Sequence, residues 1–287
     1  MFSDVKTFSG FTEVINNEEG EERGAARLVE ILNHYLGALS DAIMENKGTI
    51  DKYVGDEIVS FFGAPVPDKD NAFNACVAGI RMLQAEAQYN LENKDTLPKI
   101  PETGEPFYLH SRVGLNTGNM VVGNMGSDKK LNYTIMGNNV NLASRLEGTN
   151  KAYGSWIMAS DSTWQKADRG EHKGLLVARK FDCVRVINVV RPVQIHNILG
   201  LRNELPSAQI EAAELFNQGI EWYLKGSDTP EVPKDPEDLK KAYEYFQKAK
   251  ECYPEDKSSE VFMQRCVMYL KTGIPEIWDG VFTMKSK

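Results

Sequence analysis

The chain has few cysteines, no long apolar run and no excess of positive charge. Its four cysteines, at positions 76, 183, 252 and 266, show neither Cys-x-x-Cys spacing nor secretory context. We therefore expect reduced thiols, with Cys76 buried in a helix. No stretch is long and apolar enough to span a bilayer, and no signal peptide opens the sequence. Together these absences predict a cytoplasmic protein.

The charge balance argues against one class of partner. The net charge is −8, whereas a surface that follows nucleic-acid phosphates is normally basic, so no nucleic-acid partner is predicted. Hydrophobic residues make up 41% and charged residues 26% of the chain, which is ordinary for a globular protein. A length of 287 residues is sufficient for one compact domain and an appendage.

Two aspartates each lie at the end of an apolar, strand-like run. Asp4 belongs to Phe-Ser-Asp-Val, and Asp56 to Lys-Tyr-Val-Gly-Asp-Glu, in which Gly55 permits a tight turn. Mg²⁺ prefers hard oxygen ligands and accepts one or two carboxylates beside substrate phosphates. The pattern therefore predicts a magnesium-dependent phosphate chemistry, although a Gly-Asp pair in a hairpin is by itself ordinary turn chemistry.

A short polar turn follows Asp4 and leads into a predicted helix. The turn reads Lys6-Thr-Phe-Ser-Gly, and backbone N–H groups at a helix N-terminus can cradle a phosphate chain. Thr7, Phe8 and Ser9 are therefore candidate phosphate-binding residues.

The periodicity of apolar residues predicts helices between β-rich stretches. Residues 23–47 and 71–93 carry apolar side chains at helical spacing, Gly48 stops the first helix, and the Pro-rich segment 95–106 is a loop. Another helix is expected to begin at Asn138. The prediction is an α+β fold, a ferredoxin-like layer with an antiparallel-rich sheet and helices on one face.

Four motifs, in this order, resemble the catalytic domain of class III adenylate/guanylate cyclases. They are Phe-Ser-Asp-Val at residue 2, Lys-Tyr-Val-Gly-Asp-Glu with Phe-Gly-Ala-Pro from residue 52, Arg-Val-Gly at residue 112, and Asn-Asn-Val-Asn-Leu-Ala-Ser-Arg-Leu-Glu from residue 138. The resemblance runs from Phe2 to about Gly200. It implies a nucleotide cyclase domain over residues 1–200.

The resemblance implies a role for each matching residue. Two Mg²⁺ or Mn²⁺ ions would be held by Asp4 and Asp56, with the Val5 carbonyl assisting. Arg112 would contact the terminal phosphates. On one face of the predicted helix, Asn141 would orient the ribose and Arg145 would stabilise charge on the reacting phosphate. The alternative for Arg145 is an exposed helix arginine that pairs with Glu147 or Asp161.

Two positions of the resemblance concern the choice of base. Lys52 lies where adenylate cyclases carry a lysine that contacts adenine, and guanylate cyclases usually carry glutamate there. Thr134 lies where adenylate cyclases carry aspartate, or threonine in a subgroup that responds to bicarbonate. A lysine and a hydroxyl can read the N1 acceptor and N6 donor of adenine. Both residues favour ATP, although Lys52 on an exposed strand face is the alternative.

The chain departs from the family pattern in two places. A lysine expected in a late turn is replaced by Ile187, and Arg185 or Arg191 is a candidate to supply the missing charge. The first strand begins at Phe2, which leaves it little lead-in. A longer parent protein with sensory or membrane segments upstream would explain this beginning.

The character of the chain changes after Gly200. Residues 208–224 and 238–253 are predicted helices, joined by a Pro- and Asp-rich linker at 225–236, and the second helix matches half of a tetratricopeptide unit. One repeat cannot bury its own face. The extension, residues 201–287, is therefore expected to pack on the catalytic domain or its dimer mate, with Trp278 as an anchor.

In the family the site lies between two subunits, and this chain carries both sets of residues. The prediction is a homodimeric adenylate cyclase with two shared sites that act on ATP. A guanylate cyclase is the nearest alternative. A diguanylate cyclase is suggested by Gly55-Asp56-Glu57, but the remainder of that signature is absent. A non-catalytic nucleotide-sensing or dimerisation module is the third alternative.

Overall fold

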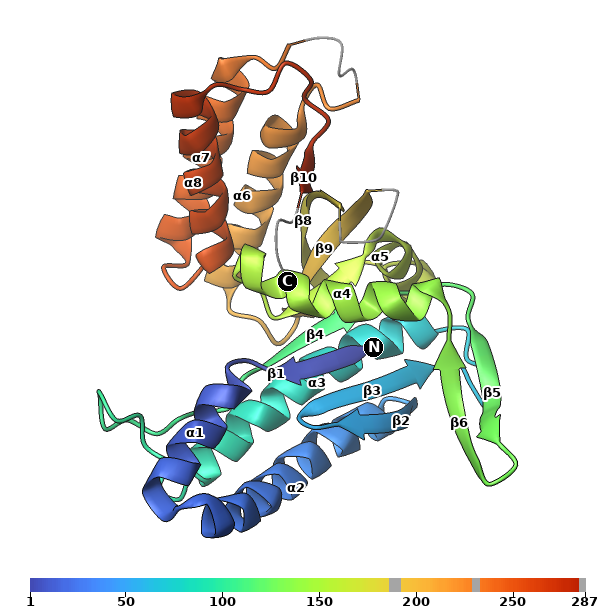
Figure 1. Ribbon diagram of the computed structural model, residues 1–287. Coiled ribbons are helices and arrows are strands. Elements are labelled where there is room, and N and C mark those ends of the chain that lie inside the picture. The colour runs from blue at the N-terminus through green and yellow to red at the C-terminus, as the bar shows by residue number, and fades with distance from the viewer. Residues whose placement is uncertain (186–191, 229–232, 284–287) are drawn as a thin grey trace. The chain divides into compact units, whose positions relative to one another are not determined.

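The computed structural model (Figure 1) describes residues 1–185, 192–228 and 233–283. The chain forms two compact units, Met1–Glu147 and Gly148–Lys287. The boundary falls inside one helix, α4 (Asn138–Tyr153). The predicted division at residue 200 follows a change in sequence character, and it stays a prediction.

The first unit is built on an antiparallel sheet of order β4-β1-β3-β2. Its strands and helices, in chain order, are β1 (Phe2–Val5), α1 (Phe8–Glu19), α2 (Glu21–Glu45), β2 (Gly48–Val54), β3 (Glu57–Phe62), α3 (Asn71–Glu92) and β4 (Ser111–Leu115). A separate hairpin, β5 (Val121–Ser127) with β6 (Lys130–Met136), precedes α4. The α+β prediction is confirmed, and the helices predicted at 23–47 and 71–93 match α2 and α3 closely.

The two faces of strand β4 have different neighbours. Ser111 faces α2 and α3, because its hydroxyl lies 2.6 Å from the Tyr35 hydroxyl and its N–H donates to Glu86 of α3 over 2.6 Å. Gly114 faces the other way, since a Cβ there would lie 2.2 Å from the Ala143 carbonyl oxygen of α4. Helices α2 and α3 thus cover one face, as predicted, while α4 contacts the backbone of β4 on the opposite face.

The second unit joins a small sheet to a set of helices. After the end of α4 it contains β7 (Ile157–Ser160), α5 (Asp161–Ala167), a short 3₁₀ turn (Gly170–His172), β8 (Leu176–Arg185), β9 (Val193–Leu201), α6 (Ser207–Leu224), α7 (Pro236–Cys252), α8 (Lys257–Thr272) and β10 (Val281–Thr283). The strand order is β10-β8-β9-β7, with β10 parallel to β8. Helices α6 and α7 match the predicted pair, whereas α8 was not predicted.

An aromatic cluster joins the helical extension to strand β8. Phe181 of β8 lies 5.5 Å from Phe216 of α6 and 5.6 Å from Phe262 of α8 between ring centroids, and all three rings are fully buried. Trp278 packs edge-on against Tyr223 at 5.3 Å and is itself buried. The extension therefore packs on the part of the chain assigned to the catalytic domain, and Trp278 anchors the tail as predicted. The tetratricopeptide resemblance stays a prediction.

Buried ion pairs fasten helix α8 to the same strand. Arg265 of α8 donates to Asp182 over 2.9 Å, and Arg179 of β8 donates to Asp256, the N-cap residue of α8. Both arginines are less than one-tenth exposed. A buried charge is strongly unfavourable without its partner, so these pairs fix α8 on β8.

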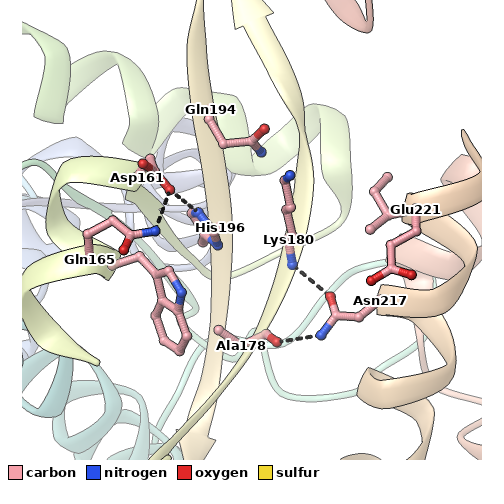
Figure 2. A pocket seen from close by; sticks show the side chains of 10 residues that line it. Asp161, Gln165, Ala178, Lys180, Gln194, His196, Asn217 and Glu221 are labelled. Atoms are coloured by element: carbon pink, nitrogen blue, oxygen red, sulfur yellow. Dashed lines mark hydrogen bonds and ion pairs between the residues drawn. The ribbon is translucent and has the colours of Figure 1, made fainter. Parts of the chain in front are cut away.

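A single side chain covers the outer edge of β8 before β10 begins. The Asn217 amide of α6 donates to the Ala178 carbonyl over 3.1 Å and accepts from the Lys180 N–H over 2.8 Å, as Figure 2 shows. Asn217 thereby supplies the two hydrogen bonds that a neighbouring strand would make. Further along β8, the Cys183 N–H donates to the Gly280 carbonyl.

Two expectations about the chain as a whole can also be compared with the structure. All four cysteines are free, and Cys76 is fully buried in α3, as predicted. Among the described residues, no helix has both the length and the apolar character needed to cross a membrane.

Candidate active site

The sheet brings the two predicted metal ligands together. Strand β1, which carries Asp4, pairs with β3, and Asp56 lies in the turn between β2 and β3. The Val5 N–H donates to the Asp56 carboxylate over 3.1 Å. Gly55 has a φ of +65°, a conformation that costs glycine little. The predicted hairpin tip is therefore confirmed, and Asp4, Val5 and Asp56 form one cluster.

Like charges crowd at this cluster. Burial, and then the hydrogen bond and charge of Asp4, raise the pKa of Asp56 to about 7. Burial and the charge of Asp4 raise the pKa of Glu147 to about 8, although Arg112 acts in the opposite direction. A proton shared by two close carboxylates indicates a position that a cation can occupy instead. The oxygen donors fit Mg²⁺ or Mn²⁺.

Arg112 lies next to these carboxylates. It stands directly opposite Asp4 in the β1–β4 ladder, so both side chains leave the sheet on the same face. Glu86 anchors the start of that strand, because it accepts hydrogen bonds from the Ser111 N–H and from the Tyr35 hydroxyl over 2.5 Å. No sequence pattern pointed to Glu86, because its partners are distant along the chain.

The predicted phosphate turn begins helix α1. Thr7 has a φ of +59° and precedes the first helical residue, Phe8, and the Lys6 N–H donates to the His110 carbonyl over 2.7 Å. The N–H groups of a first helical turn have no carbonyl one turn earlier. The N–H groups of Phe8 and Ser9, in the first turn of α1, are therefore candidate donors to an anion.

Lys52 and Thr134, which are far apart in sequence, meet in the structure. The Lys52 ammonium donates to the Thr134 hydroxyl over 3.2 Å, and this hydroxyl donates to the Asp51 carboxylate over 2.8 Å. Asp51 and Lys52 also form an ion pair at 3.5 Å. The pairing of Lys52 with Thr134 agrees with the prediction, whereas Asp51 was missed.

Asn141 and Arg145 lie one turn apart in the first half of α4. Asn141 is exposed and Arg145 is partly buried. The predicted helix start is confirmed, since α4 begins at Asn138. The contact of α4 with Gly114 sets where both side chains stand relative to β4.

The late turn, in which this chain lacks the family's phosphate-binding lysine, can be compared with the structure only in part. Ile187 and Arg191 lie outside the described residues. Arg185 is exposed at the end of β8.

A cavity of about 570 Å³ lies within the second unit. As Figure 2 shows, α5 contributes Asp161 and Gln165, the sheet contributes Lys180 and His196, and α6 contributes Glu221. Every predicted site residue lies between positions 4 and 145, so none of them lines this cavity. The Nε2 atom of His196 lies within hydrogen-bonding distance, 2.8 Å, of the Asp161 carboxylate.

A family model decides the classification. The model of the adenylate and guanylate cyclase catalytic domain matches residues 1–180. The chain belongs to this family. The match includes both carboxylates, the Lys52–Thr134 pair and helix α4.

Similar proteins agree with this assignment. A terminal-differentiation specific adenylate cyclase of Dictyostelium discoideum is 29% identical over 277 residues, which cover 95% of this chain and 11% of that protein. Adenylyl cyclase CyaB from P. aeruginosa is 33% identical, with a TM-score of 0.56 over 71% of this chain and 94% of that one. Guanylyl cyclase Cya2 is 31% identical, with a TM-score of 0.55 over 71% and 91%. The chain thus spans about a tenth of the Dictyostelium protein.

Proposed function

We propose that this chain is an adenylate cyclase, which converts ATP to 3′,5′-cyclic AMP and pyrophosphate. The observation that carries the proposal is the contact between Lys52 and Thr134 over 3.2 Å. The ammonium can donate to N1 of adenine, and the hydroxyl can accept from its N6 amino group. Guanine offers an N1–H and a carbonyl oxygen at these positions, so the pair fits ATP better than GTP. The similarity to an adenylyl cyclase structure supports this choice.

Two divalent ions, Mg²⁺ or Mn²⁺, are the proposed cofactors. Asp4 and Asp56 would hold them with the Val5 carbonyl. Burial and then the neighbouring Asp4 raise the pKa of Asp56, and the ions would balance the charge of these two carboxylates. When bound, such ions lower the pKa of the ribose 3′-hydroxyl and neutralise phosphate charge. The test is metal binding by calorimetry with wild-type protein and Asp56→Asn.

The remaining polar residues are proposed to hold the triphosphate and ribose. Arg112 and the backbone N–H groups of residues 7–9 would bind the phosphates that leave as pyrophosphate. Asn141 would orient the ribose, and Arg145 would stabilise charge on the α-phosphate. Catalysis of this kind depends on positioning and electrostatics.

The proposed assembly is a head-to-tail homodimer in which each site uses residues from both subunits. Exposed apolar side chains support it: Tyr53 and Val54 end β2 beside Asp56, and Val121, Leu131 and Met136 lie on the β5–β6 hairpin, all at least half exposed. A patch of this kind on a hairpin is typical of an interaction surface. A free monomer would then lack part of each site.

The direct test is product formation from ATP and from GTP with Mn²⁺. Cyclic AMP as the main product supports the proposal. Cyclic GMP in excess would establish a guanylate cyclase instead. Guanylyl cyclase Cya2 is similar enough to make this comparison necessary. No cyclic nucleotide from either substrate would favour a nucleotide-sensing module.

Complementation tests the shared site separately. Asp56→Ala and Asn141→Ala should each be inactive alone, because each homodimer lacks one half of both sites. A mixed dimer contains one intact site and should recover up to about half of the wild-type rate per dimer. Absence of recovery in confirmed mixed dimers would contradict the head-to-tail arrangement.

The compartment and the regulation of the enzyme are also open to proposal. ATP as substrate and four free cysteines fit a reducing compartment, so we place the activity in the cytoplasm. Stimulation by bicarbonate is proposed because Thr134 matches the responsive subgroup. Equal rates in bicarbonate and chloride at fixed pH and ionic strength would remove that proposal.

A further inference from the structure

Asp51 is a buried carboxylate beside the proposed base-reading pair. Its side chain is 2% exposed, whereas that of Lys52 is 48% exposed. The pairing between β2 and β3 shifts its register between Ile50 and Lys52, and Asp51 is the residue at this irregularity. A bulge of this kind re-aims a side chain, and here the carboxylate reaches Thr134 of the neighbouring hairpin.

The contact between Asp51 and Thr134 has a fixed direction. A threonine hydroxyl can donate one hydrogen bond and accept two, and it rotates to suit its partners, whereas an ionised carboxylate only accepts. The Thr134 hydroxyl lies 2.8 Å from the Asp51 carboxylate, so it must donate its single hydrogen bond to Asp51. The two lone pairs of the hydroxyl oxygen can then only accept hydrogen bonds. One of them accepts from the Lys52 ammonium, and the other is available to a base.

We propose that Asp51 selects adenine over guanine by holding the Thr134 hydroxyl as an acceptor. This inference rests on the proposed adenylate cyclase function. An acceptor at this position suits the N6 amino group of adenine, which donates. The same acceptor cannot form a hydrogen bond with the O6 of guanine, because O6 is an acceptor too. A freely rotating hydroxyl would serve either base, so Lys52 alone would have to discriminate.

Asp51 is a positioning residue in this scheme, because it acts through Thr134. Its ion pair with Lys52 at 3.5 Å also holds the ammonium beside the hydroxyl. The opposing interpretation is that Asp51 only stabilises the hairpin contact. A structural role of that kind would change activity with ATP and GTP to the same extent.

The first experiment measures selectivity in Asp51→Asn. An asparagine can donate to Thr134 as well as accept, so the hydroxyl proton becomes free to face guanine. We expect the ratio of kcat/KM for ATP to that for GTP to fall about 10-fold, the effect of one ordinary hydrogen bond, and the inhibition constant of GTP against ATP turnover to fall. Asp41→Asn, on the exposed surface of α2, is the matched control and should leave the ratio unchanged.

The second experiment begins with Thr134→Val, a comparison that does not need an Asp51 variant to fold. If the hydroxyl is held as an acceptor, Thr134→Val should weaken ATP while leaving the inhibition constant of GTP unchanged or lower. If the hydroxyl rotates freely, Thr134→Val weakens both nucleotides, and the proposal is overturned. In a double-mutant cycle, Asp51→Asn should add no further loss of selectivity on the Thr134→Val background.

The outcomes separate this inference from the proposed function. A wild-type protein that makes no cyclic AMP contradicts the function itself. A wild-type protein that prefers ATP, together with an Asp51→Asn variant of unchanged selectivity, contradicts only the role of Asp51. Equal losses with ATP and GTP would assign Asp51 to the hairpin structure and also overturn the proposal.

Discussion

Buried charge is arranged in opposite ways in the two units. In the first unit the acidic groups Asp4, Asp56 and Glu147 crowd together, and burial, followed by the hydrogen bond and charge of Asp4, raises the pKa of Asp56 to about 7. In the second unit buried carboxylates meet arginines: Asp182 accepts from Arg265, and Asp256 from Arg179. Oppositely charged pairs hold a fold together, whereas crowded like charges are retained where a ligand can balance them.

Removal of one crowded carboxylate should have the largest effect. Asp56→Asn keeps an acceptor for the Val5 N–H but loses a metal ligand, so turnover should fall about 10³-fold, which corresponds to roughly 4 kcal/mol in the activation barrier. The melting temperature of metal-free protein should not fall, because repulsion from Asp4 is relieved. Cyclic AMP assays and thermal unfolding test both halves. A large loss of stability would place Asp56 among structural residues.

Removal of one matched partner should have the opposite profile. Arg265→Ala leaves the buried Asp182 without its opposite charge, with the hydrogen bond from the Tyr153 hydroxyl still in place, and we expect a loss of about 3–5 kcal/mol in the free energy of unfolding, measured by urea denaturation. Arg202 is the matched control, because its pair with Glu214 is about half exposed at 3.5 Å. Arg202→Ala should cost under about 1 kcal/mol. Similar losses in the two variants would contradict the special role of the buried pair.

Raised carboxyl pKa values should make stability fall as pH rises, mainly through Asp56 of the first unit and also through Asp182 of the second, whose pKa burial raises to about 6. The folded-state pKa of Asp56 is raised, so between pH 4 and about 7 the folded chain holds a proton that the unfolded chain has lost. Stability of metal-free protein therefore falls as pH rises through this interval. Thermal melts from pH 5 to 8 should show this decline, and Asp56→Asn should make it shallower, because Glu147, with a pKa of about 8, contributes a decline of its own. Saturating Mg²⁺ should also flatten it, since ion binding replaces the proton.

The second unit should weaken at the acidic end. Burial raises the pKa of Asp256, but the charge of Arg179 and the hydrogen bonds from Arg179 and Ser259 outweigh this effect and hold that pKa below its usual value. Its contribution is complete above the usual pKa of an aspartate and is lost as pH falls through the lowered value. Replacement by Asp256→Asn should therefore reduce the loss of stability below pH 4. An unchanged acid limb would show that other carboxylates govern it.

The smallest expected effect concerns the edge of β8. Asn217→Ala removes the partners of the Ala178 carbonyl and the Lys180 N–H, at a cost of about 1–2 kcal/mol, because solvent can replace part of what is lost. Asn217→Asp keeps the acceptor for Lys180 and loses the donor for Ala178, so it should have an intermediate effect. Urea unfolding of the three proteins gives the order. A loss as large as that of Arg265→Ala would place the edge contact among the main supports of this unit.

Much of the first unit could be predicted because its signals are local. Gly55 and Asp56 specify their own turn, and the apolar stripes of α2 and α3 repeat at helical spacing. Asp51 could not be predicted, because its importance arises from a hydroxyl 83 residues away. Only the pairing of β2 with its neighbours brings the two together.

The second unit was harder to predict for a related reason. Helix α8 buries Ser258, Ser259 and Arg265 beside Phe262 and Cys266, so polar residues interrupt the apolar stripe that periodicity detects. Ser259 donates to the N-cap residue Asp256, but Arg265 and the Ser258 hydroxyl find their partners in Asp182 and Arg179 of a distant strand. A sequence pattern cannot show such partners, whereas the aromatic anchor Trp278 is conspicuous by its size.

The amide of Asn217 has a consequence beyond the fold of one molecule. An open strand edge is a template on which another chain can add a strand, and repeated addition leads to fibrils. Along β8 the positions that would accept such a strand are filled by Asn217, then by the Gly280 carbonyl and β10. Loss of this one amide would leave the backbone of β8 at Ala178 and Lys180 open to pairing with another chain. Asn217→Ala protein should therefore aggregate faster than a control variant with the same small loss of stability.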